Sequence, residues 1–424
     1  MSRFVLSILT IASIAFAAFG EEPPRFLIER IEVRNTHRVS ADLIKSESLL
    51  KEGTEYSEPD LSAAAARLTR LPFLLSAEFK LEKGSSRGQY VLAIVVTETK
   101  PFFYLIDAQP TLWDDSRHTL DYDSDPAIES KDAALGFRWF VGGRGVVYIG
   151  TTSRRDRDVF TSDYTAIAIG YTQYDLFGTR AFASINLRRP IDEHAGRLSP
   201  QVVVGLPLTT DQTLTLDYED TLVQNGTDHI LGLSFRRKEA ERLMSLTWAY
   251  DTTNQPFVPT RGTLIRVTAL HSTHDHTGYT FIGAFPDAGP EAFREHLEGS
   301  GLDVVGARYW ELSDRNSVNA AVLAGWANVD QNPAVFVPRV NYHPAYQIVR
   351  GGWSHDLWKG DPRSGDSRLE VVGALQSQQR DVREGGIVFG TTPDNTRSLL
   401  TSVSWVRRSS WGLLRLGVGY SWAL

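Results

Sequence analysis

Three closely spaced histidines have the residue type and spacing that a metal site could use. His271, His274 and His276 stand in the segment HSTHDH. Imidazole nitrogens are common zinc ligands, and residues two apart share one face of a strand. The stretch 273–301 is rich in Asp, Gly, Pro and His, which favours a long solvated loop. We therefore expect solvated histidines and no metal ion here.

Four aspartates have the spacing of a calcium loop. Asp121, Asp123, Asp125 and Asp132 match its first, third, fifth and twelfth positions. The sixth position needs a glycine for a sharp turn, but Pro126 stands there. The sequence therefore predicts no calcium site, and we expect no other metal or cofactor.

Nucleophilic and redox chemistry has little support in the sequence. It contains no cysteine, which excludes disulfides, thiolate metal sites and a cysteine nucleophile. It also lacks a Gly-x-Ser-x-Gly elbow, a phosphate loop and a zinc-protease helix. A serine or aspartate with a histidine from a distant strand stays open, but we predict that the protein is not an enzyme. The formal net charge of -7 argues against a nucleic-acid partner.

The N-terminus has the pattern of a secretory signal peptide. Residues 1–20 (MSRFVLSILTIASIAFAAFG) combine a basic residue, an apolar run and small residues near the end. We expect export and removal of this segment. No later stretch reaches the roughly 20 apolar residues of a membrane helix, so a membrane location requires a β-barrel.

Residues 21–100 carry strand and helix patterns in turn. A strand is predicted around Ile31 and Val33, with Asn35 as a turn residue that tolerates positive φ, and helices begin near Ser40 and Ser57. Apolar residues in the second helix recur on one helical face, namely Leu61, Ala64, Ala65, Leu68 and Leu71. Two further strands, the last at 90–97, complete the order β-α-α-β-β, which predicts a small α+β domain.

Several residues of this region resemble a POTRA domain, the polypeptide-transport-associated module. They are the Ile-x-Val of the first strand, Gly53 between the helices, the Arg67-Leu68 pair and the closing IVVTE that ends at Glu98. The family's usual glycine after the first strand is Asn35 here. The resemblance implies a periplasmic domain that binds extended client polypeptides by adding a strand to an open sheet edge, which we expect at 90–97.

After Lys100 the apolar period changes to two. In the last segment the large apolar residues share one face; they are Leu414, Leu416, Val418, Tyr420, Trp422 and Leu424. Such alternation over about 8 to 12 residues suits tilted strands that cross a membrane, with Tyr and Trp at the interface. We predict an all-β transmembrane barrel of about 16 antiparallel strands over 101–424, with Tyr420, Trp422 and Leu424 as its terminal-strand signal.

The predicted connections between strands come in two lengths, as expected of an outer-membrane barrel with short periplasmic turns and long outer loops. Short turns are predicted at 175–179, 207–212, 237–242 and 408–411, and long loops at 114–131, 273–301 and 328–366. We expect an even number of strands, with both termini on the periplasmic side.

One of the turns carries a specific motif. In YDTTNQPFVPTRGTLIRV, residues 250–267, the turn is formed by Asp251, Pro259, Thr260 and Gly262. Proline fixes φ and glycine permits positive φ, so the chain can reverse tightly at the periplasmic rim. The pattern resembles the Asp-x-x-x-x-(Pro)-x-x-Pro-Thr-x-Gly turn of the BamA, TamA and two-partner-secretion (TpsB) superfamily, the bacterial surface antigen type.

A second motif is Val349-Arg350-Gly351-Gly352-Trp353, within the longest late loop. It resembles the Val-Arg-Gly-aromatic motif of the same superfamily, although Gly352 delays the aromatic residue by one position. The resemblance implies that the loop folds into the lumen. There Arg350 would need an acidic partner, since a buried unpaired charge is costly and a guanidinium fork suits a carboxylate.

The acidic partner is predicted on a strand after the loop. The family's Phe-x-Asp pattern corresponds to Phe389-Gly390-Thr391, which lacks the aspartate. Glu370 falls on the side of its strand opposite Leu369 and Val371, so it is our candidate.

The resemblance covers the mature chain and implies a function. We expect an outer-membrane pore that translocates or assembles polypeptides, with a single POTRA domain in the periplasm. Its partners would be outer-membrane lipid, unfolded or extended client polypeptides and assembly-machinery lipoproteins. The alternative is a passive outer-membrane porin or structural barrel, for which deletion of 21–100 would leave conductance unchanged and cause no client defect.

Overall fold

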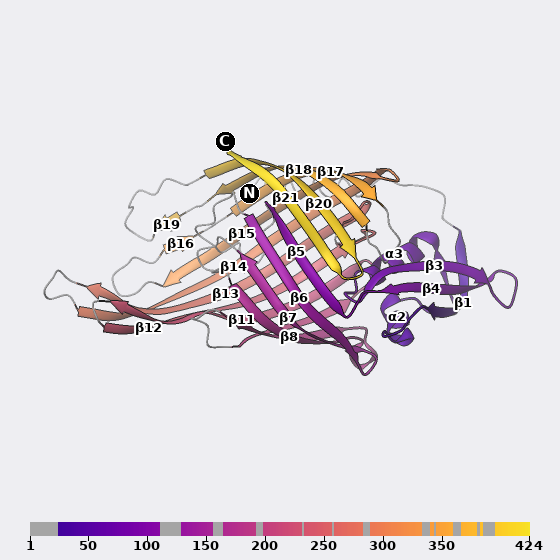
Figure 1. The fold of residues 1–424 in the computed structure, drawn as a ribbon, viewed down its shortest axis with the longest axis horizontal. Helices are drawn as coiled ribbons and strands as arrows, with labels where there is room; N and C mark the ends of the chain where they lie inside the picture. Colours follow the sequence, from indigo (N-terminus) through magenta and orange to yellow (C-terminus); the bar gives the residue numbers. More distant parts are fainter. Residues whose placement is uncertain are drawn as a thin grey trace.

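The computed structural model describes residues 24–110, 129–155, 164–191, 198–230, 233–256, 258–282, 289–332, 340–342, 345–358, 366–379, 382–384 and 395–424. The expected signal segment and three of the aspartates with calcium-loop spacing lie outside these ranges. Within them a small α+β domain is followed by a closed β-barrel (Figure 1). The expected fold class, an all-β transmembrane barrel behind a small α+β domain, is confirmed.

The small domain has one sheet and two helices. Its elements are β1 (Arg25–Arg34), α2 (Ala41–Ser48), β2 (Thr54–Ser57), α3 (Glu58–Thr69), β3 (Leu74–Lys83) and β4 (Gln89–Glu98). The sheet order is β2-β1-β4-β3, with β1 and β4 parallel. The residues expected at a sheet edge, 90–97, therefore belong to a central strand, because β1 and β3 pair with β4 on both sides. The open edges are β2 and β3.

Local signals in the sequence explain how the domain's elements begin and end. Asn35 has a φ of 65°, as expected for the residue after the first strand. Ser57 and Asp60 form a capping box at the start of α3, which satisfies backbone N–H groups that the helix leaves free. Glu98 accepts hydrogen bonds from the backbone N–H groups of His37, Arg38 and Val39 at 2.8, 3.0 and 3.1 Å. This carboxylate fixes the loop that leads into α2.

The barrel wall consists of long strands hydrogen-bonded in chain order. They are β5 (Phe102–Pro110), β6 (Glu129–Val141), β7 (Gly145–Arg155), β8 (Tyr164–Gln173), β9 (Phe182–Pro190), β10 (Ser199–Pro207), β11 (Gln212–Ile230), β12 (Leu233–Asp251), β13 (Gly262–Ile282), β14 (Gly289–Ser313), β15 (Asn316–Asn332), β17 (Ala345–Trp358), β18 (Asp366–Gln379), β20 (Asn395–Ser409) and β21 (Gly412–Ala423). Two three-residue strands, β16 (Val340–Tyr342) and β19 (Val382–Glu384), pair with each other beyond this wall.

The closure of the barrel differs from the expected even, fully antiparallel wall. Without β16 and β19, the described residues form a ring of fifteen strands. The first and last of them, β5 and β21, pair in parallel, as an odd number requires when all other neighbours are antiparallel. The start of β5 and the end of β21 therefore lie at opposite ends of the barrel, whereas the sequence predicted that the chain enters and leaves the barrel on one side. The C-terminus lies at the end of the barrel opposite the small domain (Figure 1).

The described residues of three predicted connections lie largely in strands. Residues 237–242 lie inside β12, and the segments 273–301 and 328–366 include parts of β13, β14, β15, β17 and β18. The strands β11 to β14 are 19, 19, 21 and 25 residues long, longer than the roughly 9 to 11 that cross a bilayer. When both faces of a hairpin are in water, its strands need no alternation of apolar and polar residues. The composition of such strands therefore suggests a loop.

The outer surface of the wall is apolar. On β6, the outward side chains of Leu135, Phe137, Trp139 and Val141 are each about half exposed, at 48, 47, 48 and 50%. The same alternation places the large apolar side chains of β21 outside, as the sequence predicts. A barrel with this surface suits a lipid environment. In the described ranges no helix is long and apolar enough to cross a membrane.

Candidate functional site

The small domain is docked on one end of the barrel, and polar and aromatic side chains of both parts meet at this junction. Phe73 is almost fully buried and its ring lies 5.2 Å from that of Phe140 in β6 and 5.4 Å from that of Tyr174 after β8. The core of the small domain continues through these rings into the barrel wall. The domain is therefore packed against the barrel, and not merely tethered to it.

A buried ion pair lies at the same junction. Arg67 of α3 contacts the Glu47 carboxylate of α2 at 3.0 Å, and both side chains are largely buried. Burial raises the pKa of Glu47, against the opposing effect of Arg67, and burial lowers the pKa of Arg67. Asp175 and Arg180 of the β8–β9 turn act on Glu47 electrostatically. The charge state of Glu47 is thus tied to the docking of the domain.

The predicted periplasmic turn connects β12 to β13 beneath the small domain. It lies at the barrel opening on that side, which is called the mouth below. Asp251 ends β12, and its carboxylate accepts hydrogen bonds from the backbone N–H and hydroxyl of Thr253 at 2.8 and 2.6 Å. Arg70, at the C-terminus of α3, forms an ion pair with Asp251 at 3.0 Å and donates to the Thr253 carbonyl at 2.9 Å. The small domain therefore holds the base of the turn.

The other residues predicted for this turn shape its return. Gly262 has a φ of 111°, and a Cβ there would lie 2.4 Å from the Thr252 carbonyl oxygen, so only glycine fits. The Asn254 side-chain amide donates to the Thr260 hydroxyl at 2.8 Å, and its oxygen accepts from the Thr260 backbone N–H at 3.0 Å. Pro259 immediately precedes this pair. All four predicted residues thus belong to the turn or its ends.

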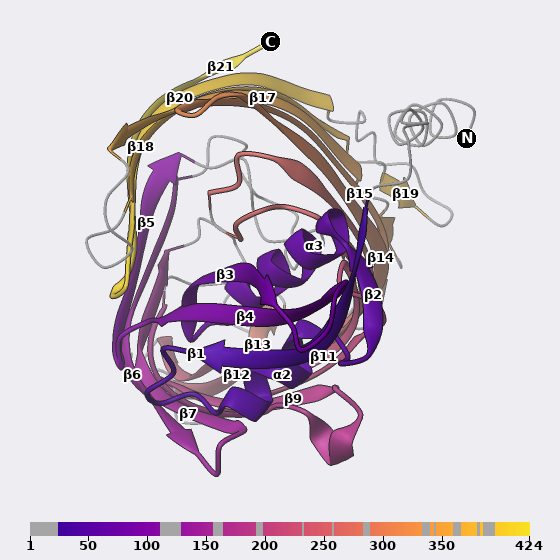
Figure 2. The ribbon, with the colours of Figure 1, turned by 90° about the vertical axis from the view of Figure 1, so that its right-hand side faces the viewer.

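The tip of the turn reaches across the barrel to a distant part of the wall. Between β13 and β20 stand β14, β15, β17 and β18. Even so, the Val258 side chain is buried against Val406 of β20 and Leu413 of β21, with Leu105 of β5 packed alongside. Viewed from the small-domain end, the chain between β12 and β13 runs inside the ring of strands (Figure 2). The turn therefore crosses the mouth.

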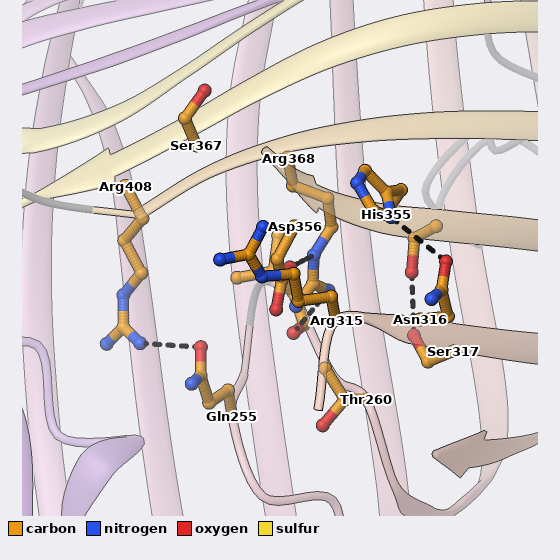
Figure 3. A network of polar contacts seen from close by, with 12 residues as sticks. Gln255, Thr260, Arg315, Asn316, Ser317, His355, Asp356, Ser367, Arg368 and Arg408 are labelled. Carbon is orange, nitrogen blue, oxygen red and sulfur yellow. Dashed lines mark hydrogen bonds and ion pairs between the residues drawn. The ribbon is translucent and has the colours of Figure 1, made fainter. Parts of the chain in front are cut away.

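Two arginines of the wall hold this tip. Arg368 of β18 donates to the Val258 carbonyl at 2.9 Å, and its Nε contacts Asp356 of β17 at 2.7 Å. Arg408 of β20 donates to the Gln255 side-chain oxygen at 3.3 Å and to the Leu75 carbonyl of the small domain at 3.1 Å. Figure 3 shows the Arg408–Gln255 and Arg368–Asp356 contacts side by side. Arg408 therefore joins wall, turn and domain.

The predicted lumen anchor lies in a strand, which corrects its expected placement in a loop. Val349, Arg350, Gly351 and Trp353 are all in β17. Val349 and Trp353 face outward, at 56 and 38% exposure, so alternation turns Arg350 into the lumen. The extra glycine, Gly352, lies next to the Asn319 side-chain amide, which would have to move to make room for a Cβ there.

The candidate acidic partner also faces the lumen. Glu370 is in β18, and its carboxylate lies 3.7 Å from the Arg415 Nε of β21. Tyr309, Glu370 and Arg415 are the groups that act electrostatically on Arg350. The structure thus gathers Arg350, Glu370 and Arg415 into one charged cluster of the lumen, with Arg415 as a member that the sequence prediction missed.

The predicted terminal-strand residues and histidines have different surroundings from those expected. Tyr420 and Trp422 of β21, and Leu424 directly after it, are exposed, at 62, 43 and 70%, at the barrel end far from the small domain. The histidines at 271, 274 and 276 lie in β13, where His271 Nδ1 is 3.1 Å from the Ser300 hydroxyl. Across the part of the chain that the structure describes, no three His, Cys, Asp or Glu residues gather as metal ligands.

Sequence reasoning missed Arg70, Arg368 and Arg408, the residues that hold the turn. Arg368 had a usable signal, because it shares a strand face with Glu370 in the segment SRLEVVG. Arg70 and Arg408 had none, since their partners stand 181 and 153 positions away. The fold and this junction define a class: a transmembrane β-barrel with a turn of its own across the mouth, beneath a docked α+β domain.

No protein-family model and no curated protein matches the chain. Among solved structures it is similar to BamA from Haemophilus ducreyi lacking POTRA domains 1–3, at 12% identity over 94% of this chain and 85% of that one, with a TM-score of 0.36. It is also similar to CdiB from Acinetobacter baumannii (10% identity, 94% and 74%, TM-score 0.40) and CdiB from Escherichia coli (11%, 97% and 93%, TM-score 0.35). These similarities are too distant to assign a family.

Proposed function

We propose that this chain is an outer-membrane pore that translocates or assembles polypeptides. The apolar outer surface of the barrel fits a lipid bilayer, and residues 1–20 would direct export. The small domain, over residues 21–100, would be a POTRA domain in the periplasm, and residues 101–424 would form the barrel. Assembly-machinery lipoproteins would be partners of this domain on the periplasmic side.

One observation carries this proposal. The docked domain has an open edge strand, β3, at the same end of the barrel as the mouth. An edge strand has unpaired backbone N–H and C=O groups, which can bind an extended polypeptide by strand addition. The first residues of β3 are anchored to the barrel through the Leu75 carbonyl and Arg408. A client paired with β3 would therefore be held next to the mouth.

The charged lumen cluster is the proposed anchor of the resting pore. Arg350 would stabilise the lumen through Glu370, which Arg415 also contacts. Glu370 attracts Arg350 and Arg415 repels it, so removing Arg350 takes one attraction out of the cluster and leaves Glu370 with Arg415 alone. We expect Arg350→Ala to lower the heat stability of the barrel and to alter its conductance, and unchanged values would refute the anchor role.

The test of the function is client capture in living cells. A photo-crosslinking residue at the exposed positions Glu78 or Lys80 of β3 should trap polypeptides in transit. The matched control is the same residue at Ala93 of β4, which is buried and paired on both sides. Adducts at β3 and none at β4 would support the proposal. No adducts at either strand, from a normally folded barrel, would favour the passive porin.

A further inference from the structure

The tip of the β12–β13 turn contacts the barrel wall in the way that a bound peptide contacts its binding site. Arg368 of the wall binds the backbone carbonyl of Val258, and Val406 and Leu413 pack against the Val258 side chain. Arg408 binds the polar side chain of Gln255. The described parts of the turn form no ladder pairs with β18, β20 or β21. The turn is therefore held by side chains of the wall, as a ligand is.

The wall builds this patch independently of the turn. Arg368 is oriented by Asp356, and both side chains are only 8% exposed. A carboxylate that fixes one edge of a guanidinium leaves its other N–H groups aimed at an acceptor. Val406 is fully buried and Leu413 is 5% exposed. Without an occupant, these apolar side chains would face the aqueous mouth, which is unfavourable.

The occupant is held in place from the small domain. Arg70 binds Asp251 and the Thr253 carbonyl, and Arg408 binds both Gln255 and the Leu75 carbonyl. A shift of the domain would break the Arg70 contacts at the base of the turn and disturb the Arg408 contact near its tip. The position of the domain and the occupancy of the patch are therefore coupled.

We propose that Arg368, Arg408, Val406 and Leu413 form a binding site for an extended polypeptide segment with an aliphatic side chain, and that the turn occupies it as an internal ligand. The inference rests on the proposed function, in which the incoming segment comes from a client. Recognition through a backbone carbonyl and one aliphatic side chain tolerates many sequences, as a pore for diverse clients requires. A client held by the small domain would displace the turn.

The test uses a disulfide lock, which is clean because the chain has no cysteine. In the full chain, Val258→Cys with Val406→Cys ties the tip of the turn to the wall. The control pair is Thr247→Cys with Thr268→Cys, whose hydroxyls are 3.0 Å apart on neighbouring strands. The probe is a fluorescent synthetic peptide, TTNQPFVPTR, which copies residues 252–261. Its binding to the purified barrel in detergent is followed by fluorescence anisotropy.

Release of the turn should open the site to the probe. Asp251→Asn weakens the contacts at the base of the turn, so it should raise the probe's apparent affinity at least about ten-fold over the wild type. The reason is that the turn is a tethered competitor of the probe and acts at roughly millimolar effective concentration. Adding Asp251→Asn to the oxidised Val258/Val406 lock should abolish this gain, and reduction should allow the lock to open. Adding it to the oxidised control pair should leave the gain intact. A peptide with Val258→Asp should not bind.

Two outcomes would overturn the inference. One is equal binding of the probe to the oxidised lock and to the oxidised control pair when both also carry Asp251→Asn. The other is no binding to any variant, although heat stability shows folded barrels. Client capture at β3 is a separate readout. A chain that traps clients but never binds the probe refutes this site alone, whereas a chain that binds the probe but traps no client refutes the proposed function.

Discussion

The backbone conformation at Gly262 does not tolerate a side chain. Its φ of 111° and the 2.4 Å approach of the Thr252 carbonyl to a Cβ leave no room for alanine. Gly262→Ala should therefore destabilise the barrel by at least about 2 kcal/mol. The measurement is the midpoint of heat unfolding. Gly373→Ala is the control, because a Cβ there meets no atom within 4 Å, and equal midpoints for the two variants would contradict the prediction.

Glu47 should make the stability of the small domain depend on pH. Its pKa in the folded chain is raised by burial above the usual 4.5. A carboxyl with a raised pKa favours the folded state when protonated, so this contribution is lost as pH rises through the folded pKa. As pH falls from 7 towards the ordinary pKa of 4.5, the wild type should gain stability relative to Glu47→Gln. Hydrogen exchange of the β4 amides measures this difference.

Glu98 provides the control with the opposite sign. Burial tends to raise the pKa of Glu98, but the backbone N–H groups of Arg38, His37 and Val39 outweigh it and lower the pKa. Its contribution is therefore present above the unfolded pKa and lost as pH falls. The wild type should lose stability relative to Glu98→Gln below about pH 5. A difference between wild type and Glu47→Gln that stays constant with pH would refute the role given to Glu47.

At the scale of elements, the parallel seam is the weakest join of the wall. β21 pairs with β5 over five residue pairs, from Gly412 to Leu416, and with β20 over twelve. Regions with fewer ladder bonds open at lower free energy. The amides of residues 102–110 should thus exchange faster than those of residues 145–155, because β7 has full ladders on both sides. Equal protection in detergent micelles would show that the seam is not weaker.

Element lengths also explain which connections the sequence predicted correctly. The turns at 175–179, 207–212 and 408–411 contain or flank the observed strand ends, because apolar alternation stops where the wall leaves the lipid. The sequence assigned residues 237–242, 273–282 and 289–301 wrongly for the same reason. Their backbone ladder continues in water, where side-chain polarity no longer marks a strand.

At the scale of the whole molecule, the closure predicts an unusual arrangement of the two ends. With β21 parallel to β5, the C-terminus lies at the end opposite the small domain. In intact cells, a cysteine that replaces Leu424 should react with a membrane-impermeant maleimide. A cysteine at Lys80 should react only after the outer membrane is opened. Labelling of both positions only after opening would contradict the parallel closure.

The sequence by itself determined the fold class, the order of the two domains and the glycine-dependent turn. Apolar alternation, helical periodicity and the φ requirements of Asn35 and Gly262 are properties of neighbouring residues, so they can be read along the chain. The same local pattern placed Arg350 and Glu370 on the sides of their strands that face the lumen. It could not reveal that Val349–Trp353 is strand, because two adjacent glycines and polar surroundings are typical of a loop.

Only the tertiary structure decided what these residues meet. Closure of the ring set the parallel seam between β21 and β5. In the small domain, pairing with β1 and β3 made residues 90–97 part of a central strand. Both outcomes depend on strands that are distant along the chain. The turn's occupation of the mouth depends on Arg70, Arg368 and Arg408, whose contacts join segments 110 to 333 positions apart. An arginine's need for an acceptor is a local property, but its acceptor is chosen by the way the whole barrel closes around it.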